Sequence, residues 1–145
     1  MEEVRSVPGW LLNRKLPDSV SLEVLDSNQK VLFSSSGKWL HPLLAAEAFL
    51  AQSTYDASTL VLHDRITGRA AAALTVRMGF KLVKASLMSQ LAESLYDRYE
   101  VAYCADQVIP RIACQTEELT ACSTDLDAIH SMIQLRAQSA TSPQI

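Results

Sequence analysis

Residues 64–69 combine charged side chains with a glycine where a ligand could bind. The segment Asp64-Arg65-Ile66-Thr67-Gly68-Arg69 lies between an apolar segment of strand length and an apolar helical segment. Where a strand ends and a helix begins, free N–H groups and the helix dipole attract anions. Arg65 and Arg69 could each hold a phosphate or carboxylate with two hydrogen bonds. Asp64 could bind a sugar hydroxyl or orient an arginine, and Gly68 would let the backbone approach the ligand. We predict a small anionic ligand here, with Lys38 of an earlier loop joining the site.

The same segment has a purely structural interpretation. Thr67 could cap the following helix, Gly68 could serve the turn, and Asp64 could pair with a neighbouring arginine. Caps and turns use the same residue types as ligand sites, so the sequence leaves both interpretations open.

Cys122 and Asp125 form a second candidate site, one for catalysis. Cys122 precedes an expected helix, where the helix dipole favours the thiolate. A thiolate there could act as a nucleophile in acyl or sulfur chemistry. His130 lies two turns along the same helix, too far to serve as its base, and an ionised Asp125 would oppose thiolate formation. Cys122 could equally be a small buried residue, with Asp125 as a first-turn acid.

Composition excludes several classes of protein. The chain has 145 residues, of which 48% are hydrophobic and 20% charged, as expected of one folded domain. Its net charge is -3 and its thirteen basic residues are scattered, which argues against nucleic acid as a partner. No apolar run is long enough to cross a membrane. Because no signal-peptide pattern is present, we expect a cytoplasmic protein with three reduced cysteines.

Strand-like and helix-like segments alternate along the chain. Alternating apolar residues predict a β-hairpin over 19–25 and 30–34, and unbroken apolar segments predict strands over 58–64, 80–86 and 101–104. Helices are expected from about 42 to 51, from Thr67 to Gly79, over 89–99 and from about 123, whereas 106–112 and 115–120 should be irregular. This order predicts an α/β protein with three layers, α-β-α, and a mixed sheet. The domain should span 19–137, after a lead-in over 1–18 and before a flexible tail over 138–145.

Four short motifs resemble those of a small bacterial and archaeal family of unknown function. Residues 64–72 (Asp-Arg-Ile-Thr-Gly-Arg-Ala-Ala-Ala) are similar to its most specific motif, an aspartate followed by Gly-[Lys/Arg]-Ala-Ala-Ala. Residues 36–44, 108–112 and 122–125 resemble its other three motifs in the same order. The resemblance spans residues 19–135, and it implies a cytidine deaminase-like fold but no activity.

The zinc ligands of active deaminases are missing from the matching positions. Those enzymes need a His or Cys with a nearby Glu at one helix start and Pro-Cys-x-x-Cys at the next. Residues 67–70 and 87–90 contain no thiol, imidazole or carboxylate. We therefore expect no metal and no cofactor, and judge zinc-dependent deamination very improbable.

Three functions remain after these exclusions. We favour a module that binds a small anionic or nucleotide-like molecule at residues 64–69. The first alternative is a metal-free enzyme with Cys122 as nucleophile. The second is a structural domain without ligand, in which residues 70–74 could pack against another copy in a homodimer.

Overall fold

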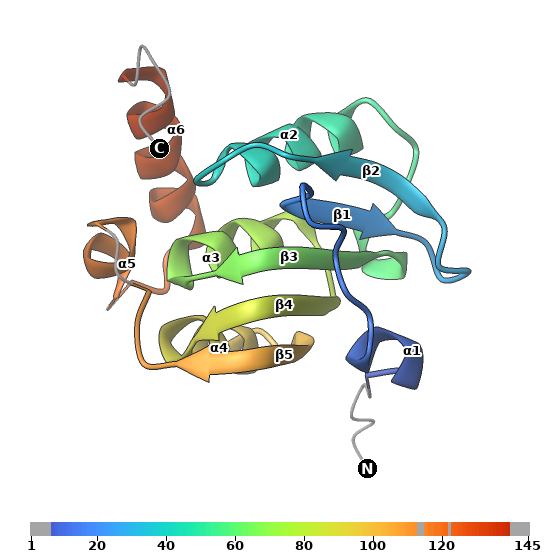
Figure 1. Ribbon diagram of the computed structural model, residues 1–145. Coiled ribbons are helices and arrows are strands. Elements are labelled where there is room, and N and C mark those ends of the chain that lie inside the picture. Colours follow the sequence, from blue (N-terminus) through green and yellow to red (C-terminus); the bar gives the residue numbers. More distant parts are fainter. Residues whose placement is uncertain (1–6, 113–114, 122, 140–145) are drawn as a thin grey trace.

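A five-stranded mixed sheet and a group of helices make up the protein (Figure 1). The computed structural model describes residues 7–112, 115–121 and 123–139. The elements along the chain are α1 (Gly9–Leu12), β1 (Leu22–Leu25), β2 (Val31–Ser35), α2 (His41–Ala51), the 3-10 helix η1 (Ala57–Thr59), β3 (Val61–Thr67), α3 (Arg69–Met78), β4 (Leu82–Ser89), α4 (Gln90–Arg98), β5 (Ala102–Ile109), α5 (Gln115–Thr120) and α6 (Leu126–Ser139).

The strand order is β2-β1-β3-β4-β5. β1 runs antiparallel to both β2 and β3, whereas β3, β4 and β5 are parallel to one another. Successive parallel strands are joined through α3 and α4, because parallel neighbours need a crossover connection. The predicted α/β fold, an N-terminal hairpin followed by parallel β-α units, is confirmed.

The two faces of the sheet are covered differently. One row of alternating strand residues, including Leu62 and Val83, packs with α2, α3, α4 and α6 in the main core. The opposite row, including Val61 and Leu25, packs with Leu11 of α1. Successive strand residues point to opposite faces, so α1 and the other helices form outer layers around the sheet, the three-layer α-β-α arrangement predicted.

Local sequence signals explain where several helices begin and end. Pro42 lies in the first turn of α2, where a missing N–H costs little. The hydroxyl of Ser89 accepts from the N–H of Ala92 and caps α4, the helix expected over 89–99. Gly79 ends α3 with φ 103°, a conformation that side chains disfavour. None of the described helices is long and apolar enough to cross a membrane.

Four expectations about the elements were wrong. β3 begins at Val61 and continues through the charged residues to Thr67, and β5 continues to Ile109 because β4 offers a backbone partner that far. Residues 115–120 form helix α5 instead of a loop. Thr67 does not cap α3, since Gly68 is the N-cap and the Thr67 hydroxyl donates to Asp64. The expected tail lies partly outside the described residues, which end at Ser139.

Candidate functional site

The two arginines of the predicted ligand site point toward different parts of the protein. Arg65 donates to the carbonyl oxygens of Pro17 (2.7 Å) and Val20 (2.6 and 3.0 Å), in the segment before β1. Arg69 is buried and donates to the carbonyl of Ser123 (2.8 and 3.0 Å), and also to α4 through Leu91. Both guanidinium groups therefore join backbone segments, and the structure does not bring them together.

Asp64 is a buried acid just before this corner. Its carboxylate accepts a hydrogen bond from the hydroxyl of Thr67 (3.1 Å). Burial raises the pKa of Asp64 to about 7, against the opposing effects of that hydrogen bond, of nearby backbone N–H groups and of the Arg65 charge. Asp64 therefore changes charge near neutral pH.

Glu117 of α5 occupies the N-terminus of α3. Its Oε1 accepts from the N–H of Arg69 (2.6 Å) and its Oε2 accepts from the N–H of Ile112 (3.1 Å). The residue is 1% exposed. The position where a helix start attracts an anion is thus filled by a carboxylate of the protein itself.

Gly68 is required by the approach of Glu117. A Cβ atom at position 68 would lie 2.6 Å from Glu117 Oε1 and 3.3 Å from its Cδ. The sequence predicted a close approach at Gly68 and assigned it to a ligand, whereas the approaching group in the structure is this side chain.

Sequence reasoning missed Glu117 because its helix has no apolar face. Thr116, Glu117 and Thr120 are buried, at the i, i+1 and i+4 positions of one helix face. That spacing is helical, but a search for apolar periodicity passes over a buried face made of polar residues.

A cavity of about 270 Å³ opens beside Gly68 and Glu117. Trp39 and Leu40 come from the loop before α2, Ile66 comes from β3, and Ala70 and Ala71 come from α3. Among the described residues, the lining consists of Trp39, Leu40, Ile66, Gly68, Ala70, Ala71, Ile112, Thr116 and Glu117. This described part of the wall is therefore largely apolar, and Glu117 is its single acid.

Trp39 holds an unusual backbone conformation at this cavity. Its φ is 57°, in the left-handed region that few residues other than glycine and asparagine adopt. Its ring meets the ring of His41 edge-on, with 5.2 Å between centroids. Strained backbone of this kind gathers at ligand sites, which makes Trp39 a further candidate for ligand contact.

Two exposed cationic residues are the sequence neighbours of residues that line the cavity. Lys38 precedes Trp39, and Arg111 precedes Ile112. Lys38 was predicted as a site residue, and its side chain is exposed. Arg111 was not predicted, because nothing in the sequence shows that residue 112 returns to α3.

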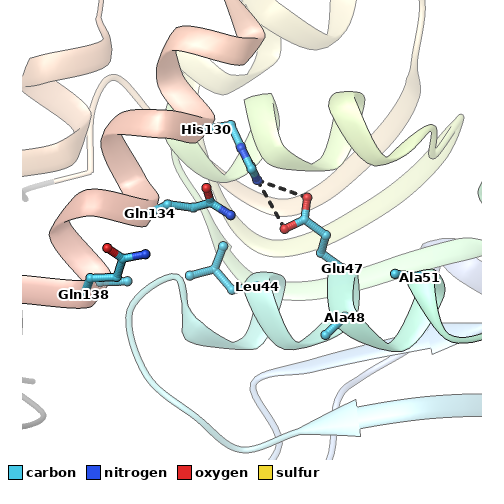
Figure 2. A pocket seen from close by; sticks show the side chains of 8 residues that line it. Leu44, Glu47, Ala48, Ala51, His130, Gln134 and Gln138 are labelled. Atoms are coloured by element: carbon cyan, nitrogen blue, oxygen red, sulfur yellow. Dashed lines mark hydrogen bonds and ion pairs between the residues drawn. The ribbon is translucent and has the colours of Figure 1, made fainter.

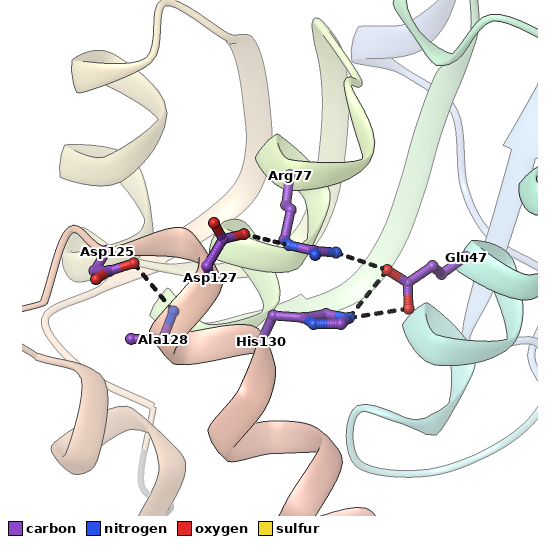
Figure 3. Close-up of polar contacts among 6 residues, drawn as sticks. All are labelled: Glu47, Arg77, Asp125, Asp127, Ala128 and His130. Atoms are coloured by element: carbon purple, nitrogen blue, oxygen red, sulfur yellow. Dashed lines mark hydrogen bonds and ion pairs between the residues drawn. The ribbon is translucent and has the colours of Figure 1, made fainter.

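The second predicted site lies only partly in the described structure. Cys122 is outside the described residues. Asp125 is exposed, and its Oδ1 accepts from the N–H of Ala128 (3.0 Å; Figure 3). Asp125 thus caps α6.

A wider groove of about 620 Å³ lies between α2 and α6 (Figure 2). Across it, His130 Nε2 meets both carboxylate oxygens of Glu47, at 3.1 and 3.2 Å. Arg77 of α3 joins the same carboxylate (3.2 Å) and contacts Asp127 of α6 (2.9 Å; Figure 3). This network fastens α2, α3 and α6 together and uses the polar groups of the groove for packing.

No three His, Cys, Asp or Glu side chains within residues 7–112, 115–121 and 123–139 gather as metal ligands would. The starts of α3 and α4 carry Gly68-Arg69 and Ser89-Gln90.

The strand order and the flanking helices define the chain as a three-layer α-β-α protein with a mixed sheet. The chain belongs to the family described as a domain of unknown function, DUF1893, whose model matches residues 14–133. The crystal structure of a DUF1893 family protein (TM1506) from Thermotoga maritima is similar to it, with a TM-score of 0.72 and 20% identity over 82% of each chain. Structural similarity at this level of sequence identity shows the fold alone. The match to the family model confirms the family resemblance that the motifs indicated. No curated protein matches the chain.

The contact of Gly68 with Glu117 predicts a destabilising effect of one added methyl group. Gly68→Ala should lower the free energy of unfolding by about 1–3 kcal/mol, since the carboxylate must move. Urea denaturation measures this loss, and Gly37→Ala is the matched control because its nearest atoms lie at 3.5 Å. In a double-mutant cycle, Gly68→Ala should cost less beside Glu117→Asp, whose shorter side chain relieves the contact. Equal costs in both backgrounds would contradict this account.

The buried Asp64 predicts how stability depends on pH. The pKa of Asp64 in the folded protein, about 7, exceeds its ordinary value of 3.8. The contribution of Asp64 to the free energy of unfolding is therefore present below pH 4 and is lost as the pH rises to 7. Relative to wild type, Asp64→Asn should gain stability over this range, by at most about 4 kcal/mol. Chemical denaturation at pH 4, 5, 6 and 7 measures the difference. A difference that does not change with pH would show that Asp64 is ionised throughout.

Proposed function

We propose that the protein is a small-molecule binding module and that the cavity beside Gly68 is its binding site. The proposal rests on one observation. An apolar cavity, a tryptophan with a strained backbone and one buried carboxylate lie together at the carboxyl end of β3. Open α/β sheets bind ligands at this end of their parallel strands.

The cavity lining favours a small, flat and mainly apolar group. A volume of about 270 Å³ is below the range of roughly 300–1,000 Å³ that holds drug-sized ligands. Trp39 offers a ring face for stacking, and Ala70 and Ala71 offer a shallow wall. Glu117 can accept a further hydrogen bond, so the group inside should present an N–H or O–H to it.

An anionic part of the ligand would lie outside the cavity. An anion at the start of α3 would have to displace Glu117, and the guanidinium groups of Arg65 and Arg69 donate to backbone carbonyls. Lys38 and Arg111 are exposed beside the wall residues. A nucleotide-like ligand, with its base inside and its phosphate near Lys38, fits this distribution of charge.

Thermal denaturation with a panel of ligands tests the proposal. Nucleobases, nucleosides, nucleoside monophosphates and sugar phosphates would each be added to the full chain. A ligand at 100 times its Kd stabilises by about 2.7 kcal/mol, which should raise the Tm by roughly 5–10 °C. Trp39→Ala should remove the shift, whereas Trp10→Phe, on the opposite face of the sheet, should keep it and leave Trp39 as the fluorescent probe.

A charge variant separates the two parts of the ligand. Lys38→Ala should weaken binding of a monophosphate but not of the corresponding nucleoside. Lys30→Ala, an exposed lysine of the hairpin, should weaken neither. A panel that leaves the Tm unchanged, or a shift that survives Trp39→Ala, would refute binding at this cavity.

A further inference from the structure

Residues 7–16, here called the strap, cover the face of the sheet opposite to α3. Figure 1 shows α1, the helical part of the strap, apart from α2 to α6. Leu11 is fully buried against Leu25 and Val61, with Trp10 beside them. This apolar contact is small, so further interactions must hold the strap in place.

A row of four chemically different side chains lies on that face. The strand registers pair Glu23 with His63, His63 with Lys84, and Lys84 with Cys104. Paired residues on neighbouring strands point to the same face, which is also the face of Val61, two residues before His63. A carboxylate, an imidazole, an ammonium and a thiol therefore follow one another across four strands.

Lys84 fastens the backbone of the strap. Its side chain is 0% exposed, and its Nζ donates to the carbonyl oxygens of Leu12 (2.7 Å) and Arg14 (2.8 Å). Its third partner is Asp106 on β5, at 3.2 Å, which also accepts from Lys15 of the strap. A buried ammonium is stable only when its donors are satisfied, so the closed strap and the burial of Lys84 depend on each other.

Arg14 of the strap requires His63 to be neutral. Its guanidinium donates to Glu23 Oε1 (2.6 Å) and lies 2.8 Å from His63 Nδ1. Arginine has donors only, so Nδ1 must accept and the imidazole proton must be on Nε2. His63 Nε2 is a buried donor with no partner among the described residues.

A second proton on His63 would break this contact. It would place an N–H at Nδ1, facing the donors of Arg14, and a new positive charge near Arg65 on β3 and Lys84 on β4. The acids facing the cluster are Glu23 on β1 and Asp106 on β5, and both already form ion pairs with cations of the row or the strap. Cys104 on β5 supplies no negative charge, because burial raises the pKa of its thiol.

We propose that the strap is a proton-operated latch, which is closed while His63 is neutral and is released when His63 is protonated. Release would expose the Glu23–His63–Lys84–Cys104 row and free residues 7–16. This regulation is independent of the proposed binding cavity, since it concerns the opposite face of the sheet.

The direction of the pH effect follows from the two states of His63. Burial, followed by the charges of Arg14 and Lys84, lowers the pKa of His63 from 6.5 to about 4 in the closed state. With the strap open, the exposed imidazole returns toward its ordinary value, so the open state binds more protons and gains population as pH falls. The ratio of open to closed strap changes only between about pH 6.5 and pH 4, and in that range the change approaches tenfold per pH unit.

Hydrogen exchange of the full chain at pH 7, 6 and 5 tests the latch. After correction for intrinsic exchange rates, protection of a peptide covering residues 7–16 should fall about tenfold per pH unit below about 6.5. A peptide from α3 should keep its protection. His63→Asn keeps an acceptor near the Nδ1 position but cannot be protonated, so its strap should show no pH dependence, whereas the exposed His41→Asn should behave as wild type.

A measurement on the wild-type protein covers the case in which His63→Asn does not fold. The ¹⁵N shifts of His63 at pH 7 should show the Nε2–H tautomer, and its titration midpoint should lie well below 6.5. The latch is refuted by an Nδ1–H tautomer, by an ordinary midpoint, by strap protection that does not change with pH, or by parallel loss of protection in α3.

Discussion

The enclosure of α3 is the constraint on which the rest of the structure depends. The helix neighbours the sheet, α4, α5 and α6, and its residues from Arg69 to Thr75 are all buried. Alanines at four consecutive positions allow the neighbours to come this close. The N–H groups at the start of a helix enclosed in this way need acceptors from the protein where they are turned away from solvent. Glu117 provides one, and its position brings α5 against Gly68 and leaves the cavity between α5, Trp39 and the alanines.

The two faces of the sheet are stabilised by different kinds of interaction. On the α3 face, small apolar residues pack closely around buried polar groups such as Asp64, Arg69 and Glu117. On the other face, Lys84 and His63 lie under the short strap. Protonation has opposite effects on the two faces: it stabilises the fold at Asp64, whereas at His63 it opposes the contact with Arg14. The strap and the proposed binding cavity thus lie on opposite sides of one sheet.

The elements of the fold were largely predictable because their signals are local. The alternation in residues 19–25, the unbroken apolar strands, Gly79 and the Ser89 cap all act within a few residues, and each indicated the right kind of element. The errors came where a partner elsewhere in the chain decides the outcome. β3 extends through charged residues because β4 pairs with it, and α5 forms with a polar buried face because Thr116 and Glu117 meet α3.

The sequence by itself determined the α/β class, the order of the elements and the special character of residues 64–69. Only the tertiary structure decided the partners of those residues. Glu117 reaches Arg69 across 48 positions, and Arg14 reaches His63 across 49. A motif records which side chains are present, whereas their charge state and their freedom to bind a ligand depend on distant groups that folding places beside them. For that reason the arginines that looked like an anion site hold backbone segments together, and the acid that borders the cavity came from a segment expected to be a loop.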